Sequence, residues 1–221
     1  MADQQRVMRP LDDLINPSEP AYPLLKQWAA DAVRPVEFLP PSANRADALL
    51  QTQVTTRSPM GAIVYETGGI LIDNGWLRIL GSGHPKLTRT VPAWNQSRAN
   101  GFYLIADDAV GGFFAINGGA LGTDTGNVYY FAPESLRWEP LELGYSDFLV
   151  ASFSPKLDDF YKPIRWSTWQ CEIANLHGDR CFFFAPPPWT KEGKPPAAPY
   201  ADVPVEEAWD LQMDFRRQLG S

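Results

Sequence analysis

Few side chains in this sequence have the type and spacing that catalysis or metal binding requires. His84 and His177 are the two histidines, and histidine is the usual general base and soft metal ligand near neutral pH. Cys171 and Cys181 flank His177 at a distance, whereas a structural zinc site uses closely spaced pairs such as Cys-x2-Cys. The spacing therefore predicts no metal ion and no cofactor, and we interpret both cysteines as free thiols.

A glycine-rich stretch around a predicted hairpin holds the densest set of polar groups. It contains four candidate residues of an enzyme site: Glu66, Asp73, Arg78 and His84. Such a set would suit a hydrolase or a metal-dependent enzyme if the side chains met in one pocket. Ser82 lacks both the Gly-x-Ser-x-Gly context of an activated nucleophile and the Lys-Ser/Thr ending of a phosphate loop. An enzyme is therefore the alternative hypothesis, with its catalytic residues unassigned.

Negative charge gathers in the middle of the chain. Residues 101–160 carry nine Asp and Glu against two Lys and Arg, while residues 74–106 before Asp107 carry four Lys and Arg and no acid. The acidic block includes Asp107, Asp108 and Asp124, and it favours a protein partner with a basic surface. Direct binding of nucleic acid is disfavoured, because phosphate contacts need a clustered excess of Lys and Arg.

Apolar periodicity and turn residues predict the elements that must position these groups. The first sixty residues are read as helical segments separated by prolines, and a further helix covers 60–67. Asn74-Gly75 then joins two apolar runs, 70–73 and 76–80, which is the pattern of a hairpin with a two-residue type I′ turn. The chemistry-bearing residues of the glycine-rich stretch therefore lie on or beside this hairpin.

The later part of the chain alternates strands and helices. Strands are predicted over 102–106, 112–117, 127–131, 137–141 and 181–184, and helices over 90–99, 145–153, within 157–169 and over 204–219. Residues 186–199 are proline-rich and are read as a surface loop. We predict an α+β fold with a mostly antiparallel mixed sheet of five to seven strands, flanked by N- and C-terminal helices, in one globular domain over 1–221.

No targeting or membrane-spanning segment is expected. Residues 1–6 are polar and are followed by no apolar run, so the sequence predicts no secretory signal. The least charged stretch, 109–123, is too short and too rich in glycine to span a bilayer. We expect a cytoplasmic protein without a membrane partner.

Two stretches of the sequence resemble the DUF2625 family of uncharacterised bacterial proteins. The first runs from Tyr65 to Gly83, and the second from Asp159 to Trp166 with Trp169 after it. Together with the spacing between them, the resemblance covers most of residues 40–215. Arg165, in the second stretch, completes the set of candidate binding residues.

More distantly, the middle of the chain resembles the SUKH superfamily. Residues 107–117, 127–131 and 138–153 follow its order of a Gly-Gly-Phe-Phe-Ala-Ile-Asn strand, an aromatic strand, and a tryptophan strand with a helix. The resemblance implies a mixed α+β fold and protein binding, and many bacterial members look like immunity proteins that neutralise secreted nuclease toxins. The long part after Pro155 has no counterpart in the small SUKH modules.

The leading hypothesis is a protein-binding module, immunity-like or regulatory, that docks its acidic block on a basic partner such as a toxin. This hypothesis predicts that the carboxylates of Asp107, Asp108 and Asp124 share an exposed surface. A third hypothesis, a self-associating subunit that forms a homo-oligomer, requires a large apolar surface patch.

Overall fold

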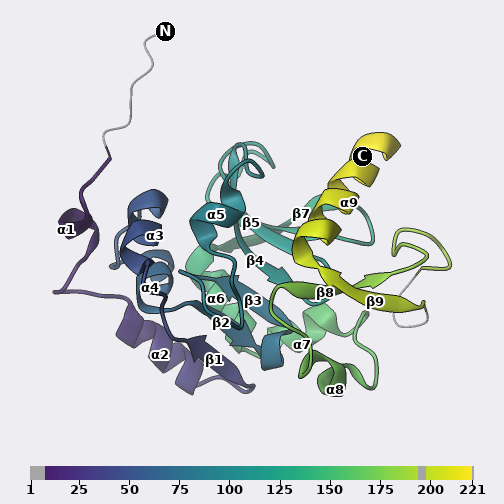
Figure 1. The fold of residues 1–221 in the computed structure, drawn as a ribbon, viewed down its shortest axis with the longest axis horizontal. Helices are drawn as coiled ribbons and strands as arrows, with labels where there is room; N and C mark the ends of the chain where they lie inside the picture. Colours follow the sequence, from purple (N-terminus) through teal and green to yellow (C-terminus); the bar gives the residue numbers. More distant parts are fainter. Residues whose placement is uncertain (1–7, 194–197, 221) are drawn as a thin grey trace, which may run out of the picture.

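The computed structural model describes residues 8–193 and 198–220 of the 221-residue chain. Its centre is a seven-stranded antiparallel sheet in which each strand pairs with the next along the chain. The strands are β1 (Val36–Leu39), β2 (Gly69–Ile72), β3 (Leu77–Leu80), β4 (Phe102–Asp108), β5 (Phe113–Asn117), β6 (Asn127–Ala132) and β7 (Arg137–Gly144). A second antiparallel pair, β8 (Arg180–Phe184) and β9 (Tyr200–Pro204), lies at the right of Figure 1.

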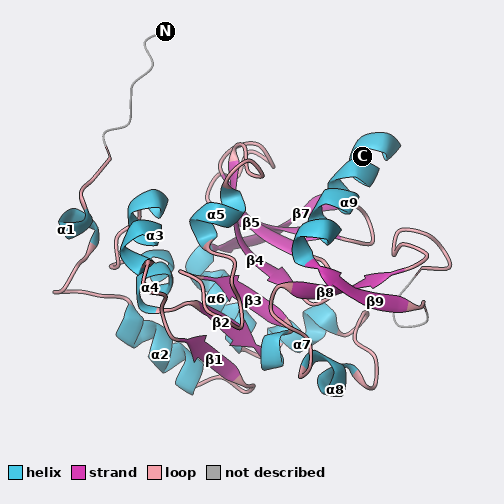
Figure 2. Cartoon of the chain, viewed as in Figure 1, coloured by secondary structure: helices cyan, strands magenta, loops and turns pink. Residues whose placement is uncertain are grey.

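Helices lie on both sides of the sheet (Figure 2). In the described residues they are α1 (Leu11–Leu14), α2 (Tyr22–Ala30), α3 (Arg45–Thr52), α4 (Pro59–Glu66), α5 (Val91–Asn95), α6 (Tyr145–Phe153), α7 (Lys156–Tyr161), α8 (Trp169–Ile173) and α9 (Val205–Leu219), with a short 3-10 turn at Asp73–Gly75. The fold is therefore α+β with a mostly antiparallel sheet, as the sequence predicted.

Alternation along the strands builds two apolar cores, one on each face of the sheet. Phe113 of β5 packs with the core that includes α3, α5 and α9, whereas its neighbour Phe114 packs with the core that includes α2, α6 and α7. Successive side chains of a strand point to opposite faces, so both faces of β5 are buried. Continuous apolar runs such as Phe113–Ile116 are the sequence signature of this double burial.

The C-terminal helix α9 closes the sheet on the face that also carries α5. It begins after Pro204, carries two glutamates in its first turn and two arginines in its last, and ends at Gly220, whose φ is +68°. Charges placed in this way complement the helix dipole. Trp209 of α9 packs edge-on against Phe113 of β5 with ring centroids 4.8 Å apart.

Three parts of the fold differ from the sequence prediction. The segment 36–39, expected within a helical region, is the edge strand β1, and β9 was also missed. The β2–β3 hairpin is confirmed, but the pairing of Ile72 with Leu77 leaves four connecting residues instead of two. Asp73 and Asn74 have positive φ in this longer turn. The turn places Trp76 in the core against the rings of α7 and α8 residues and of Trp166, which explains the extra length.

Both cysteines are free thiols, Cys171 exposed and Cys181 buried. No helix in the described part of the chain combines the length and the apolar character that a bilayer crossing needs. The expectation about a secretory signal concerns residues 1–6, and part of the expected proline-rich loop concerns residues 194–197; both lie outside the described residues.

Candidate functional site

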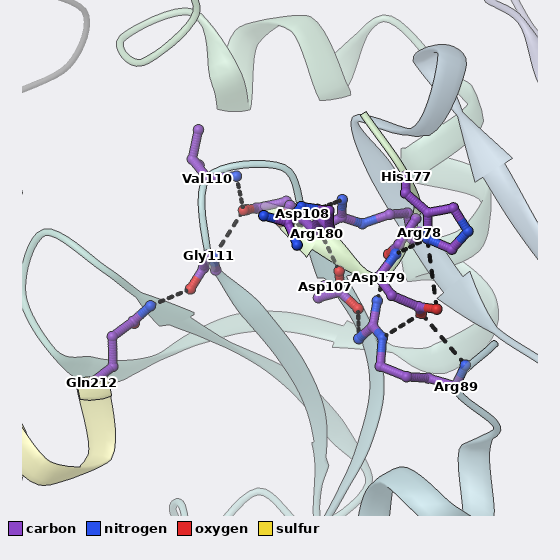
Figure 3. Close-up of polar contacts among 12 residues, drawn as sticks. Arg78, Arg89, Asp107, Asp108, Val110, Gly111, His177, Asp179, Arg180 and Gln212 are labelled. Carbon is purple, nitrogen blue, oxygen red and sulfur yellow. Dashed lines mark hydrogen bonds and ion pairs between the residues drawn. The ribbon is translucent and has the colours of Figure 1, made fainter. Parts of the chain in front are cut away.

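A network of buried charges joins the sheet to the β8–β9 pair (Figure 3). The Nη2 atom of Arg78, on β3, lies 2.6 Å from Oδ1 of Asp107 on β4, and both side chains are almost fully buried. Arg89 approaches the other oxygen of Asp107 at 2.5 Å and also reaches Asp179 at 2.9 Å. Although burial opposes its charge, the two carboxylates raise the pKa of Arg89. The network therefore alternates positive and negative groups through the protein interior.

Backbone carbonyl groups accept from both terminal nitrogens of Arg78, whereas its buried Nε has no hydrogen-bond partner among the described residues. Arg78 donates to the carbonyl oxygen of Arg180 at 2.7 Å and to that of Asp108. Asp179 accepts hydrogen bonds from Thr88 as well, so the loop after β3 and the loop before β8 are held together. These contacts indicate that the network has a structural role, because they connect β3 and the loop that follows it to the loop before β8.

Asp108, the neighbour of Asp107, lies on the other face of β4 and is also buried. Its Oδ1 accepts from the amides of Val110 and Gly112 at 3.0 and 2.8 Å. Its Oδ2 accepts from the hydroxyl groups of Tyr130 and Tyr161 at 2.9 and 3.0 Å. Burial raises the pKa of Asp108 against the effect of these donors, and burial beside Asp108 raises the pKa of both tyrosines well above its usual value. All four donors depend on one carboxylate.

The expectation of an exposed acidic surface at Asp107, Asp108 and Asp124 is therefore wrong for the first two residues. Asp107 and Asp108 have no exposed surface at all, and their charge is compensated inside the protein. Asp124 lies in the β5–β6 loop, where it accepts hydrogen bonds from Tyr129, Asn117 and Asn127. The hydrogen bond from Tyr129 is the main cause that lowers the pKa of Asp124. This carboxylate shapes its own loop.

A second charge cluster brings together two of the predicted site residues, Asp73 and Arg165. Oδ2 of Asp73 lies 2.6 Å from Arg165 and 2.7 Å from Arg34. Both arginines also contact Asp158 of α7, at 3.0 and 3.1 Å. Arg165 lies 4.0 Å from the ring centre of Trp169, so its guanidinium gains a cation–π contact as well. The cluster ties the β2–β3 turn to α7 and to the segment before α8.

Acid should weaken this second cluster through Asp158. Hydrogen bonding by Arg34, helped by Arg165, lowers the pKa of Asp158. A lowered pKa in the folded state contributes stability above the ordinary aspartate value of about 3.9, and that stability is lost as pH falls through the folded-state value. We therefore expect Asp158→Asn to lower the urea midpoint at pH 6, with a difference from wild type that shrinks towards pH 2. A constant difference across this range would contradict the assignment.

The remaining hairpin candidates do not join these clusters. Glu66 pairs with Arg45 at 3.4 Å on the surface. His84 lines a cleft of about 690 Å³ between α3 and the loop that precedes α5, and it is the one member of the Glu66–His84 set that does so. Ser82 lines the same cleft, but its hydroxyl is buried and donates to the carbonyl oxygen of Thr67 at 2.8 Å rather than to a general base. The four side chains therefore do not meet in one pocket.

The other histidine is also engaged within the chain. His177 Nε2 lies 2.8 Å from the carbonyl oxygen of Pro85, and Nδ1 accepts from the amide of Asp179 at 3.2 Å. Among the residues that the structure describes, no three His, Cys, Asp or Glu side chains converge as metal ligands would.

Exposed acids do gather elsewhere in the block 101–160, on the edge of the sheet and on the helices beside it. We call them the β7–α7 acidic surface: Glu134, Glu139, Glu142, Asp147 and Asp159. Within the described part of the chain none of these five takes part in an ion pair. The sequence contained only a partial signal for this surface: Arg137–Leu141 was predicted as a strand that includes Glu139, whereas the position of the other acids was not predicted.

Fold and site define an α+β protein with a seven-stranded antiparallel meander and two interior charge clusters. The sequence matches the family model described as "Protein of unknown function DUF2625" over residues 11–207. The chain belongs to this family. It is 44% identical to the putative uncharacterized protein YbfG of Escherichia coli (strain K12) over 216 residues, which cover 95% of this chain and 98% of that protein. An uncharacterized protein of Haemophilus influenzae is 40% identical over 187 residues, covering 81% of this chain and 82% of its own. No solved structure matches the chain.

Proposed function

We propose that the protein binds another protein through the β7–α7 acidic surface. The observation that carries this proposal is the set of five exposed carboxylates that lack internal counter-charges. Glu134 belongs to the β6–β7 turn, Glu139 and Glu142 to the edge strand β7, Asp147 to α6 and Asp159 to α7. The helix α6 contacts both β7 and α7, so these elements form one continuous part of the surface.

The positive charges of residues 74–106 do not supply a counterpart for this surface. Arg78 and Arg89 both form ion pairs with the buried Asp107 of the interior network. Lys86 pairs with Glu37 at 2.6 Å, and Arg98 pairs with Glu206. The four cations of the basic block are thus paired within the chain, whereas the five carboxylates of the β7–α7 acidic surface form no ion pair among the described residues. A free acidic surface attracts a basic partner and raises the rate of association.

The finer proposal is an immunity-like or regulatory role against a basic protein such as a secreted nuclease toxin. Its support is the sign of the charge and the resemblance of residues 107–153 to the SUKH superfamily. The alternative enzyme hypothesis receives less support, because Glu66, Asp73, Arg78 and His84 have separate partners and do not share a pocket.

A differential capture experiment tests the proposal. Cells that make the protein would be lysed, and proteins captured by wild type would be compared with those captured by a variant that carries Glu139→Lys, Glu142→Lys and Asp147→Lys. We expect the variant to lose a basic protein whose retention by wild type falls as salt is raised from about 50 to 500 mM, because salt screens exposed charges.

The matched control reverses three exposed acids elsewhere: Asp12→Lys, Asp31→Lys and Asp210→Lys. It changes the net charge by the same amount and should keep the partner. Equal capture by the two variants would show that net charge alone, or another surface, is responsible, and the proposal would fail.

A further inference from the structure

An apolar groove lies inside the β7–α7 acidic surface, between the edge strand and the two helices that follow it. Its volume is about 200 Å³. Its lining is apolar except for Ser152 and Lys156, and it includes Leu141 and Leu143 of β7, Phe148 and Ala151 of α6, and Leu157 and Phe160 of α7. A dry cavity of about 150 Å³ holds a benzene ring, so this groove has room for a large apolar side chain. The hydroxyl group of Ser152, which lines the groove, donates a hydrogen bond to the carbonyl oxygen of Phe148. Its donor is therefore satisfied without a ligand.

The rim of the groove carries two acids, Glu142 and Asp159, and one exposed lysine, Lys156. Glu142 lies between the two leucines of the wall, and Asp159 directly precedes Phe160. Phe160, which lines the groove, remains 38% exposed, so its ring is accessible to a partner. The exposed acids around the groove, which include Glu139 and Asp147, outnumber Lys156. An apolar floor within a net acidic surface is complementary to a segment that carries apolar anchors flanked by Lys or Arg.

The irregular backbone of the edge strand β7 disfavours pairing with a further strand. Pro140, in the middle of β7, has no amide hydrogen to donate. Between the pairs Tyr129–Pro140 and Asn127–Gly144 the register shifts, because three residues of β7 oppose one of β6, and Glu142 has a φ of +57°. Bulges, prolines and charges are the features by which edge strands avoid pairing. A partner therefore has to engage the side chains of the groove rather than the backbone of the edge.

We propose that the groove receives the apolar face of a basic amphipathic helix from a partner protein. This inference rests on the proposed function and specifies its mode of binding. An amphipathic helix presents apolar anchors on one face and basic residues beside them, as recognition of helices in grooves requires. A second copy of this chain is not the expected occupant, because α9, its longest described amphipathic helix, already packs Ala208 and Trp209 into the core.

Two labelled peptides of identical Lys and Leu composition test the mode of binding. One repeats Leu with a helical period over about four turns, and the other alternates Lys and Leu with the period of a strand. Binding would be measured by fluorescence anisotropy with the full-length protein at low and high salt. We expect the helical peptide to bind at least about tenfold more tightly than the alternating one. Equal affinities, or no binding of the helical peptide, would overturn the inference.

Variants separate the groove from its charged rim. Ala151→Trp fills the groove and should weaken binding of the helical peptide by about tenfold, while Ala30→Trp, on the exposed end of α2, should have no effect. Phe160→Ala removes an exposed wall residue and should weaken binding in the same direction without crowding α6. The urea midpoint of each variant shows whether it is folded.

The charge variant distinguishes failure of the groove from failure of the acidic surface. If Glu139→Lys, Glu142→Lys and Asp147→Lys abolish binding while Ala151→Trp and Phe160→Ala do not, the groove is not the anchor site and the proposed function stands. If the charge variant binds like wild type, both proposals fail.

Discussion

Replacing Arg78 with methionine should lower the free energy of unfolding by about 3–5 kcal/mol, the usual cost of breaking a buried ion pair from one side. The side chain of Arg78 is 1% exposed and that of its partner Asp107 is 0% exposed, so water cannot replace the lost guanidinium. The change also leaves the carbonyl oxygens of Arg180 and Asp108 without their donor. Urea denaturation followed by tryptophan fluorescence measures the loss.

A double variant tests how much of the loss comes from Asp107, which in the single variant keeps only Arg89 as an ion-pair partner among the described residues. Arg78→Met combined with Asp107→Leu removes both partners, and Arg89 still keeps Asp179 at 2.9 Å. We expect the double variant to be more stable than the sum of the two single losses would give. Arg137→Met, at an exposed position of β7, should change stability by less than about 0.5 kcal/mol. A loss below about 1 kcal/mol for Arg78→Met alone would contradict the structural role of the network.

The sheet was largely predictable because its signals are local. The Asn74-Gly75 turn, the apolar runs of β4 to β6 and the helix over 145–153 each follow from a few neighbouring residues. The edge strand β1 was missed because its four residues are too few to show a clear alternation of apolar and polar side chains. Its pairing with β2 also joins residues that lie at least as far apart in the sequence as Leu39 and Gly69. The length of the β2–β3 turn was missed because burial of Trp76 against distant rings determines it.

The candidate site was harder to predict, because the number of charged residues in a segment does not indicate which of them are buried. Asp107 and Asp108 follow the apolar run of β4 and read as a polar turn, yet they end a central strand that is covered on both faces. Their partners Arg89 and Tyr161 lie far along the chain in opposite directions, so no local spacing could reveal them. The exposed acids of β7, in contrast, belong to an edge strand. Glu139 and Glu142 lie three positions apart, and the irregularity of β7 around Glu142, which alternation alone does not predict, helps to expose both.

Replacing Asp108 with leucine should cost on the order of 4–6 kcal/mol, because it leaves four buried donors without an acceptor. The two amides of Val110 and Gly112 and the two tyrosine hydroxyls all point at this one carboxylate. Asp108→Asn should cost less, about 1–2 kcal/mol, because its amide oxygen can keep two donors and hydroxyl groups can turn to accept from its NH2 group. Chemical denaturation of both variants against wild type gives the two losses.

Variants of Tyr130 and Tyr161 test whether unsatisfied hydroxyl groups cause the loss of stability in Asp108→Leu. In the Asp108→Leu background, changing Tyr130 and Tyr161 to phenylalanine removes two of the stranded donors and should restore about 2 kcal/mol, whereas the same two changes in wild type should destabilise. This reversal of sign distinguishes unsatisfied hydroxyls from a simple packing defect, which would make the two sets of losses add. Because Tyr161 belongs to α7 and Tyr130 to β6, the same measurement tests whether Asp108 is what fixes α7, one wall of the apolar groove, against the sheet.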